Sequence, residues 1–335
     1  MVARPLNCRQ RLRTRSLLTV TGVAIAAAAL LAPPRASEAG EARSKVILDG
    51  KPVAVHFNDG DSFRVIGGTA NGTKARLMGF NTLESYGPVH SWGGWTEKEM
   101  YVLAKMATLN ARRGVWECFS QGDVDTYGRS LIWCPGLAED QIRKGLAHVM
   151  TVTDDPGDAA LVAAQKDAIA NRRGIWAHGV PDFVLTSLHS IDESIGRKDR
   201  ERNYNRLVSS EDGHSVKWKH QDVYNECDKI CHKTYRVDEA KVGAVAQALQ
   251  GDKRFASALA GLSPDVIRGV VRDFARFRHV NRDVPKDERD ALAAHLRDLA
   301  ARGELGSDTV GEAASCMVHV PFKRRYGGGK AECLK

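Results

Sequence analysis

Oxygen-bearing side chains are concentrated around Arg76 between residues 58 and 84 of this 335-residue chain. The carboxylates of Asp59, Asp61 and Glu84 flank two short alternating runs that are typical of strands joined by glycine turns. Carboxylates at the start of one strand and oxygens just past a later strand can converge on one end of a small barrel. Calcium prefers such a set of hard oxygen ligands, and the planar guanidinium of Arg76 suits a phosphate group.

Three sequence segments follow one another in a recognisable order: DGDS at 59–62, ARLMGFNTLE at 75–84 and DTYGRSLI at 125–132. Together they resemble the signature motifs of the staphylococcal nuclease family, and the segments at 144–149 and 170–176 agree with it. The resemblance covers roughly residues 45–178. It implies an α+β fold, in which a five-stranded OB-type barrel with three packed helices forms a domain over residues 44–180.

The resemblance also assigns metal ligands. Asp61 and Asn81 would bind calcium through their side chains, and Thr82 would bind it through its backbone carbonyl. Asp59 would support these ligands as a neighbouring carboxylate. The expected cofactor is therefore Ca²⁺.

The implied reaction is hydrolysis of phosphodiester bonds. Glu84 would orient or deprotonate the attacking water, while Arg76 and Arg129 would bind the phosphate and neutralise its developing charge. DNA is the expected substrate, and RNA is left open. The alternative is a catalytically weak module that binds nucleic acid or a partner. The joint presence of Glu84 and both arginines favours the enzyme, because binding alone needs no base.

The chain departs from the family pattern at four positions. Asn81 stands where the family usually has an aspartate, which removes one negative charge from the expected metal site. Leu83 replaces the usual proline, which would loosen the turn before Glu84. Thr151 and Thr153 stand where the family's best-known member has tyrosines that stack on the nucleotide. These departures bear on metal affinity and substrate preference more than on the fold.

The spacing of Arg76 and Asn81 sets a geometric condition on the site. They are five residues apart, so on a straight strand their side chains would lie on opposite faces. They can share a site only if the chain bends between them. Gly79 is the expected hinge.

Charge and the N-terminal residues indicate the compartment and the kind of partner. A formal charge of +8 and a pI near 9.1 suit a polyanionic partner. Arginines precede an apolar run at 17–32 and then small residues, which is the layout of a secretory signal. We expect residues 1–39 to be cleaved and the mature chain to be secreted or periplasmic, without stable membrane insertion.

Six cysteines follow the expected signal, and export predicts that they form three disulfides. Cys118 and Cys134 end two strands that are expected to pair, so we predict a bond between them. Cys227 and Cys231 are predicted to pair with the last two cysteines, Cys316 and Cys333, in an order that stays open. The alternative is a zinc site that uses these four cysteines with His232 and His319.

Helix signals place three helices in the first half of the chain. A capping box predicts a helix from Thr96 to about Arg113, and the remaining two are predicted at 137–149 and 158–173. The second of these helices carries His148, which is interpreted as a surface or packing residue. Residues 85–94 are expected to form a loop, and 115–119 and 129–134 to form paired strands.

Residues 181–335 show no recognisable chemistry and are predicted to be mainly helical and disulfide-stabilised. Helices are expected after Ser263-Pro264 and at 287–302, and the charged stretch at 192–206 is interpreted as a linker or surface helix. Arg268, Arg272 and Arg276 follow one helix face, which is either solvated or a nucleic-acid contact. The sequence does not determine the role of this region or the oligomeric state.

Overall fold

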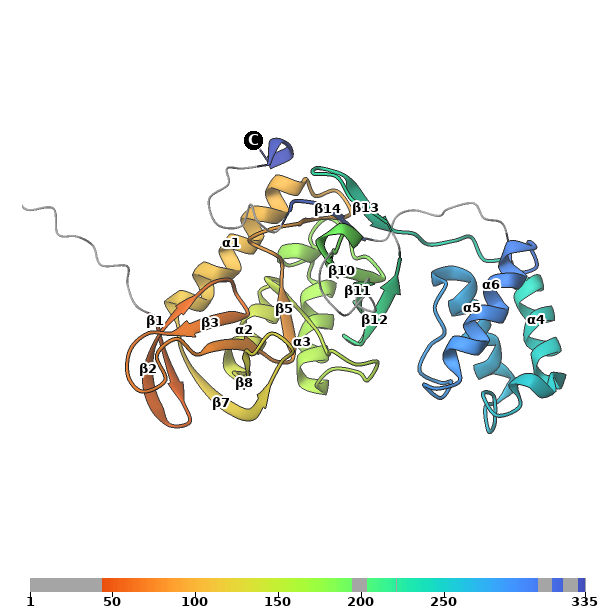
Figure 1. The fold of residues 1–335 in the computed structure, drawn as a ribbon, viewed down its shortest axis with the longest axis horizontal. Coiled ribbons are helices and arrows are strands. Elements are labelled where there is room, and N and C mark those ends of the chain that lie inside the picture. Colours follow the sequence, from red (N-terminus) through yellow and green to blue (C-terminus); the bar gives the residue numbers. More distant parts are fainter. Residues whose placement is uncertain (1–43, 195–203, 221, 307–314, 322–330, 335) are drawn as a thin grey trace, which may run out of the picture. The chain divides into compact units, whose positions relative to one another are not determined.

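A computed structural model describes residues 44–194, 204–220, 222–306, 315–321 and 331–334 of the chain. The fold is mixed α+β, as expected, and combines a closed barrel with smaller sheets and α-helices (Figure 1). The described α-helices are α1 (Glu97–Arg113), α2 (Pro135–Arg143), α3 (Ala159–Ala170), α4 (Glu239–Gly251), α5 (Pro264–Phe277) and α6 (Arg289–Ala301).

The barrel has six hydrogen-bonded strands where five were expected, in the order β1-β2-β3-β4-β8-β7. These strands are β1 (Ser44–Leu48), β2 (Lys51–Phe57), β3 (Ser62–Val65), β4 (Lys74–Leu77), β7 (Val115–Val124) and β8 (Ser130–Trp133). The barrel closes because β1 pairs antiparallel with β2 and parallel with β7. Alternate side chains such as Val55, Phe57 and Phe63 fill its interior, as the period of two in a strand requires.

Helix α1 begins and ends where the sequence predicts. The Thr96 hydroxyl accepts from the backbone N–H of Glu99, whose carboxylate accepts in return from the backbone N–H of Thr96. The indole N–H groups of Trp92 and Trp95 both donate to the carbonyl of Ile175. The two tryptophans therefore clamp the start of α1 rather than forming an open stacking surface.

The predicted helix at 137–149 is wrong in its second half. Helix α2 ends at Arg143, and the chain then forms strand β9 (Ala147–Val149), which pairs with β5 (Phe80–Thr82). The break lies at Gly145, where φ is +64° and a Cβ atom would meet the Arg173 carbonyl oxygen at 2.2 Å. Only glycine tolerates this close approach of two backbones. His148 therefore lies on a buried strand.

The described residues after 180 form strands as well as the expected helices. Strands β10 (Phe183–Ser187), β11 (Tyr204–Ser209) and β12 (Ser215–Lys219) form an antiparallel sheet. A second sheet has the order β13-β14-β6, with β13 at Lys229–His232, β14 at Ser315–Val318 and β6 at Val89–Ser91. The expected loop at 85–94 thus contains a strand, and the expected linker at 192–206 ends in β11. Residues 195–203 lie outside the described part.

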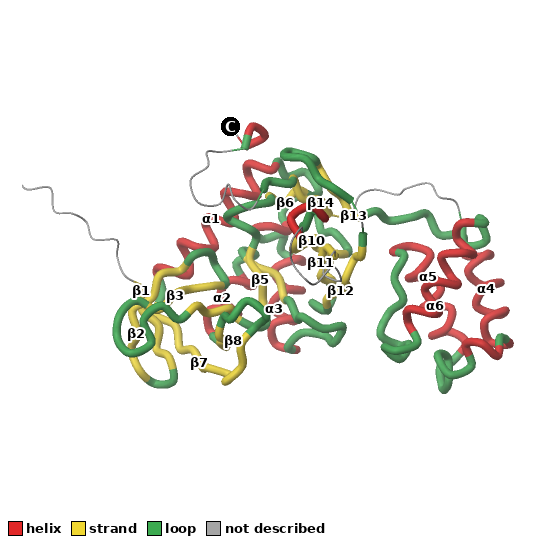
Figure 2. The backbone as a smooth tube through the Cα atoms, viewed as in Figure 1, coloured by secondary structure: helices red, strands yellow, loops and turns green. Residues whose placement is uncertain are grey.

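Helices α4, α5 and α6 lie beside one another (Figure 2). Their buried apolar side chains form a hydrophobic cluster of their own. Helix α5 begins at the predicted Ser263-Pro264 cap, and Ile267, Val270 and Phe274 are buried on its apolar stripe. Helix α4 was not predicted. Of the three arginines on the polar face of α5, two pair with Glu239 and the third pairs with Asp182.

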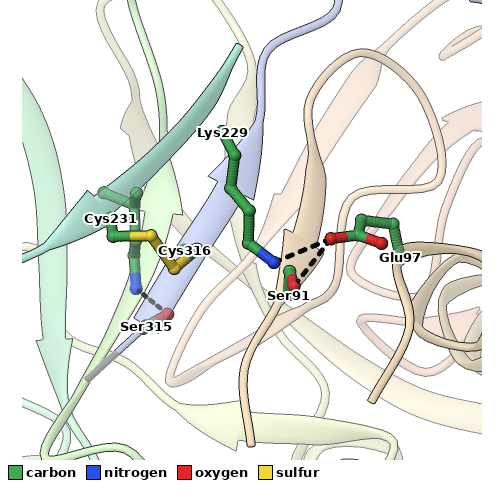
Figure 3. Close-up of a disulfide and its surroundings, with 7 residues drawn as sticks. Ser91, Glu97, Lys229, Cys231, Ser315 and Cys316 are labelled. Carbon is green, nitrogen blue, oxygen red and sulfur yellow. Dashed lines mark hydrogen bonds and ion pairs between the residues drawn. A yellow bond between two sulfur atoms is a disulfide. The ribbon is translucent and has the colours of Figure 1, made fainter. Parts of the chain in front are cut away.

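All three predicted disulfides are present, and the open pairing order is resolved. Cys118 bonds to Cys134, Cys231 to Cys316 and Cys227 to Cys333. Figure 3 shows Cys231–Cys316 between β13 and β14, beside an ion pair of 2.9 Å between Lys229 and Glu97. The cysteines are thus oxidised, and the alternative zinc site is not formed.

The expected signal segment at 1–39 lies outside the described residues. In the part of the chain that the structure describes, every helix is too short or too polar to cross a membrane.

Candidate active site

The site forms where the turn before β3 meets strand β5. Asp61 is buried in this turn, and one of its carboxylate oxygens, Oδ2, accepts a 2.8 Å hydrogen bond from the backbone N–H of Thr82. Gly60 permits this contact, because a Cβ atom there would lie 2.5 Å from a methyl carbon of Thr82. Two of the three expected metal ligands are therefore in direct contact.

Arg76, on β4, connects the remaining ligand to this pair. One guanidinium nitrogen donates to Asp61 Oδ1 at 2.9 Å, and the other donates to Asn81 Oδ1 at 2.6 Å. The contact with Asn81 requires the predicted bend, and Gly79 supplies it with a φ of +84°. A side chain at Gly79 would also collide with Trp133, whose ring carbon lies 2.4 Å from the position of a Cβ atom. The hinge at Gly79 is therefore confirmed.

Several carboxylates act on Arg76 at once. Burial by itself would lower the pKa of its guanidinium, but the negative charge of Asp61, followed by Asp59, Glu84 and Asp125, raises that pKa above its ordinary value. All four acidic groups therefore lie close enough to Arg76 to interact with its positive charge. Arg76 thus remains fully charged despite its burial.

Asp59 is the acidic group most perturbed by this crowding. Its Oδ1 accepts from the Ser62 hydroxyl at 2.6 Å and from the backbone N–H of Asp61 at 3.3 Å. Burial, and then the charge of Asp61, raise the pKa of Asp59 to about 7. The two buried aspartates therefore compete for limited positive charge, and a bound divalent cation would relieve that competition.

His148 also belongs to the site, although no sequence signal pointed to it. It lies directly opposite Asn81 in the β5–β9 pair, and its Nε2 is 3.4 Å from the amide nitrogen of Asn81. Its Nδ1 is 3.0 Å from the carbonyl oxygen of Val149. Burial lowers the pKa of His148 to about 4, so the ring is neutral at pH 7. An Nδ1–H that donates to Val149 leaves Nε2 as an acceptor for the Asn81 amide.

These contacts fix the orientation of the Asn81 amide. Its nitrogen also donates to the Thr82 carbonyl at 2.8 Å, so both of its protons have acceptors. Its oxygen accordingly faces Arg76. Finding His148 from sequence would have required the β5–β9 pairing, which a helical reading of residues 137–149 hides.

Glu84 and Arg129 lie around this centre. Glu84 is half-buried two residues beyond β5, and the preceding Leu83 is fully buried against Met100 and Trp176. Packing of Leu83, rather than a proline ring, therefore holds the chain before Glu84.

Arg129 precedes β8, the parallel neighbour of the strand that carries Arg76. Its Nε donates to Asp125 Oδ2 at 2.6 Å, and its guanidinium lies 5.6 Å from the Tyr127 ring centre. Contacts with Arg129 help to lower the pKa of Asp125, although partial burial opposes this shift. This ion pair uses only the Nε atom of Arg129. The two terminal nitrogens of its guanidinium take no part in the pair.

The oxygen atoms at the site are of the chemical types that bind calcium. Asp61, Asn81 and Thr82 offer a carboxylate, an amide oxygen and a backbone carbonyl, all of them hard oxygens on adjacent residues. Each of these oxygens accepts a hydrogen bond from Arg76, from Thr82 or from the Asn81 amide. Among the described residues, no cluster of three or more His, Cys, Asp or Glu side chains could hold a metal. Calcium would therefore depend on the neutral oxygens and on water.

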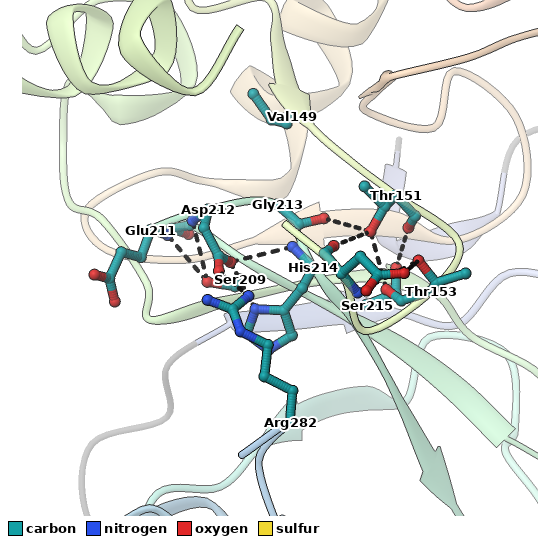
Figure 4. A network of polar contacts seen from close by, with 12 residues as sticks. Val149, Thr151, Thr153, Ser209, Glu211, Asp212, Gly213, His214, Ser215 and Arg282 are labelled. Atoms are coloured by element: carbon teal, nitrogen blue, oxygen red, sulfur yellow. Dashed lines mark hydrogen bonds and ion pairs between the residues drawn. The ribbon is translucent and has the colours of Figure 1, made fainter. Parts of the chain in front are cut away.

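Thr151 and Thr153 do not form an open stacking surface. The Thr151 N–H donates to the Gly213 carbonyl at 2.8 Å, and the Ser215 N–H donates to the Thr153 carbonyl at 2.7 Å. The Ser215 hydroxyl also donates to the Thr151 carbonyl. Figure 4 shows this network, which joins the segment after β9 to the turn between β11 and β12. The β11–β12 hairpin therefore packs against the segment that carries Thr151 and Thr153.

Comparison with models of known protein families gives no match for this chain, and comparison with curated proteins gives no significant match.

Proposed function

We propose that the chain is an exported nuclease of the staphylococcal nuclease type, which hydrolyses phosphodiester bonds in a calcium-dependent reaction. The observation that supports this most is the Arg76 guanidinium, which is bonded to both Asp61 and Asn81 and lies close to the buried carboxylate of Asp59. A structural ion pair would need one carboxylate, whereas four acidic groups act on this arginine. The six-stranded barrel is compatible with an OB-type fold, and the three disulfides suit an oxidising compartment.

The residues of the site have different roles in the proposed hydrolysis. Glu84 takes the proton of the attacking water, because it is a half-buried carboxylate within electrostatic reach of Arg76. Arg76 and Arg129 bind the phosphate oxygens and stabilise the negative charge that develops as the leaving oxygen departs. A calcium ion held by Asp61, Asn81 and Thr82 would add positive charge next to the phosphate.

A bound phosphate would rearrange both contacts that Arg76 makes with Asp61 and Asn81. Both terminal nitrogens of its guanidinium are engaged by protein oxygens, at 2.9 and 2.6 Å. A phosphate can replace these partners because it offers the same paired-oxygen geometry with more negative charge. Asp61 and Asn81 then become available as ligands.

A nuclease assay tests the proposal. The mature chain is incubated with single-stranded and duplex DNA and with RNA, in calcium and then in a calcium chelator. We expect cleavage that requires calcium. Absence of cleavage of all three substrates in excess calcium would exclude a nuclease of this type.

The contacts of Arg76 also favour a second candidate, a binding module with weak catalysis. With both terminal nitrogens bonded within the protein, the arginine fills the space between the expected metal ligands. A chain that binds DNA with equal affinity in calcium and in chelator, and leaves it intact, would fit this candidate.

A further inference from the structure

A cavity of about 620 Å³ lies along β12, away from the catalytic cluster. β12 is an edge strand of its sheet, so side chains from both of its faces line the cavity. The end of α5, the following segment and the first turns of α6 form the opposite wall.

Ion pairs and a contact between aromatic rings hold the two walls together. Arg289 of α6 forms an ion pair with Asp154, and Arg282 pairs with Asp212 at 2.8 Å. The rings of Phe183 and Phe277 meet edge to face with centres 5.3 Å apart. The cavity is therefore bounded by packed elements on both sides.

The cavity is strongly cationic. Eight of its lining side chains are lysines or arginines, and only two are aspartates. Lys217 and Lys219 on β12, and Lys286 and Arg297 on the opposite wall, are exposed. These four cations form no ion pair with any residue that the structure describes. A polyanion would find positive charge on both walls.

Aromatic rings lie among these cations. Trp218, Tyr235 and Phe277 are half-buried in the lining, and the Arg278 guanidinium lies 3.9 Å from the Tyr235 ring centre. Cations that follow a phosphate backbone, interleaved with rings on which bases stack, are the pattern of sites for single-stranded nucleic acid.

Protection of the sheet edge explains only part of this pattern. Lysines on an edge strand prevent unwanted strand pairing, which would account for Lys217 and Lys219. It does not account for Lys286, in the turn before α6, or for Arg297, on α6. A ligand that bears several phosphates accounts for both walls.

We propose that this cleft binds a single-stranded stretch of nucleic acid, as a second holding site for the substrate of the hydrolysis proposed above, on which this role rests. Residues 152–154, at the rim of the cleft, follow directly on the strand that carries His148. Thr153 is five positions beyond His148, which is at most about 18 Å of extended chain. One strand can therefore reach from the catalytic cluster to the cleft.

Binding without cleavage provides the test. The full mature chain is titrated into a fluorescein-labelled oligothymidylate of about 20 nucleotides, long enough for a complete single-strand site, with a chelator present to prevent hydrolysis. The variants are Lys217→Glu with Lys219→Glu, and Lys286→Glu with Arg297→Glu. The matched control, Lys166→Glu with Lys253→Glu, makes the same charge change at exposed lysines outside the cleft.

Each cleft variant should weaken binding about tenfold or more at 0.1 M salt, and the control by less than about threefold. Loss of two phosphate contacts should also reduce the slope of log affinity against log salt by about 1.4. Cleft variants that bind no more weakly than the control would overturn the proposal, and so would a parent chain that does not bind the oligonucleotide.

Cleavage of a dinucleotide separates this proposal from the proposed hydrolysis. A dinucleotide is too short to occupy both places, so the cleft variants should cleave it at the parent rate. If the cleft variants lose strand binding but the parent cleaves nothing, the cleft is a nucleic-acid site and the hydrolysis is wrong. If the parent cleaves and strand binding is insensitive to the cleft, the cleft proposal is wrong.

Discussion

At the scale of single residues, Asn81 differs from an aspartate in more than charge. Its amide nitrogen donates to the Thr82 carbonyl and faces the neutral Nε2 of His148. An aspartate would direct an oxygen at both of these acceptors. The neighbourhood of residue 81 is thus arranged for an amide, and a carboxylate there would depend on a cation.

Replacing Asn81 by aspartate should therefore change metal affinity and stability in opposite directions. Calcium affinity is tuned by ligand charge, so the added carboxylate should tighten binding several-fold in titration calorimetry at neutral pH, on the order of 1 kcal/mol. Without calcium, the Asn81→Asp variant should unfold at a lower temperature than the parent, because a further acidic group adjoins Asp61 and Asp59.

Asn171→Asp is the matched control, since Asn171 is an exposed amide at the end of α3. It should leave calcium affinity unchanged. Equal or weaker calcium affinity for Asn81→Asp would show that residue 81 is not a ligand.

Glu84→Gln keeps the shape of the side chain and removes the proposed base. Cleavage in excess calcium should slow by about a hundredfold or more, the usual contribution of such a group. Affinity for a single-stranded oligonucleotide in chelator should change little, because the arginines remain. Parental cleavage rates in this variant would contradict the role of Glu84.

At the scale of elements, signals between residues close in sequence predict the structure here, whereas some strands depend on distant pairings that carry no local signal. The Thr96 box, the Ser263-Pro264 start and the hinge at Gly79 depend on residues close in sequence, and all three are confirmed. Strand β6 exists because it pairs with β14, more than two hundred residues later. Its three residues carry no strand pattern of their own, so their pairing cannot be read from the segment alone.

The same difference between local and distant contacts applies to the residues of the site. Asp61, Arg76, Asn81 and Thr82 come from one stretch, and their convergence was expected from motifs and a hinge. His148 joins them only because the close approach at Gly145 stops α2 and lets β9 form. That break depends on contact with Arg173 and Gly174, which adjoin the end of a different helix.

Gly145→Ala should therefore destabilise the fold more than an ordinary glycine substitution. Left-handed backbone by itself costs an L-residue about 1–2 kcal/mol. At Gly145 a Cβ atom would also meet a backbone oxygen at 2.2 Å, so two segments must separate. Gly122→Ala is the matched control, with a φ of +78° and no atom within 4 Å. Urea denaturation should give a clearly larger loss for Gly145→Ala, and equal losses would contradict the close-approach argument.

At the scale of the whole molecule, buried histidines couple stability to pH. Burial lowers the pKa of His90 to about 3, and the pKa values of His148, His232 and His279 to about 4. Each ring takes up a proton more readily in the unfolded chain than in the native one. The free energy of unfolding should therefore fall as pH drops from 6.5 toward 4.

Between pH 6.5 and 5 each histidine can contribute up to about 2 kcal/mol of this loss. Asp59 acts in the opposite direction. Its native pKa of about 7 lies above the ordinary 3.8, so its contribution is present at low pH and is lost as pH rises from 4 to 7. Four histidines outweigh one aspartate, so denaturant titrations should show lower stability at pH 5 than at pH 7. A flat or inverted profile would contradict the assignment of neutral buried rings.

The bond between Cys227 and Cys333 also determines how the chain would carry tension. A pull on its two ends would pass from Cys227 directly to Cys333, because the covalent bridge is shorter than the 106 residues it spans. The α4–α6 helices, β13 and β14 would then bear no force, however weak their own packing. After reduction of both C-terminal disulfides, the residues between Cys227 and Cys333 should extend as well. Single-molecule stretching should then record an added contour length of about 350–380 Å. In an oxidising medium, therefore, a pulling force would not extend the part of the chain that forms the wall of the cleft opposite β12.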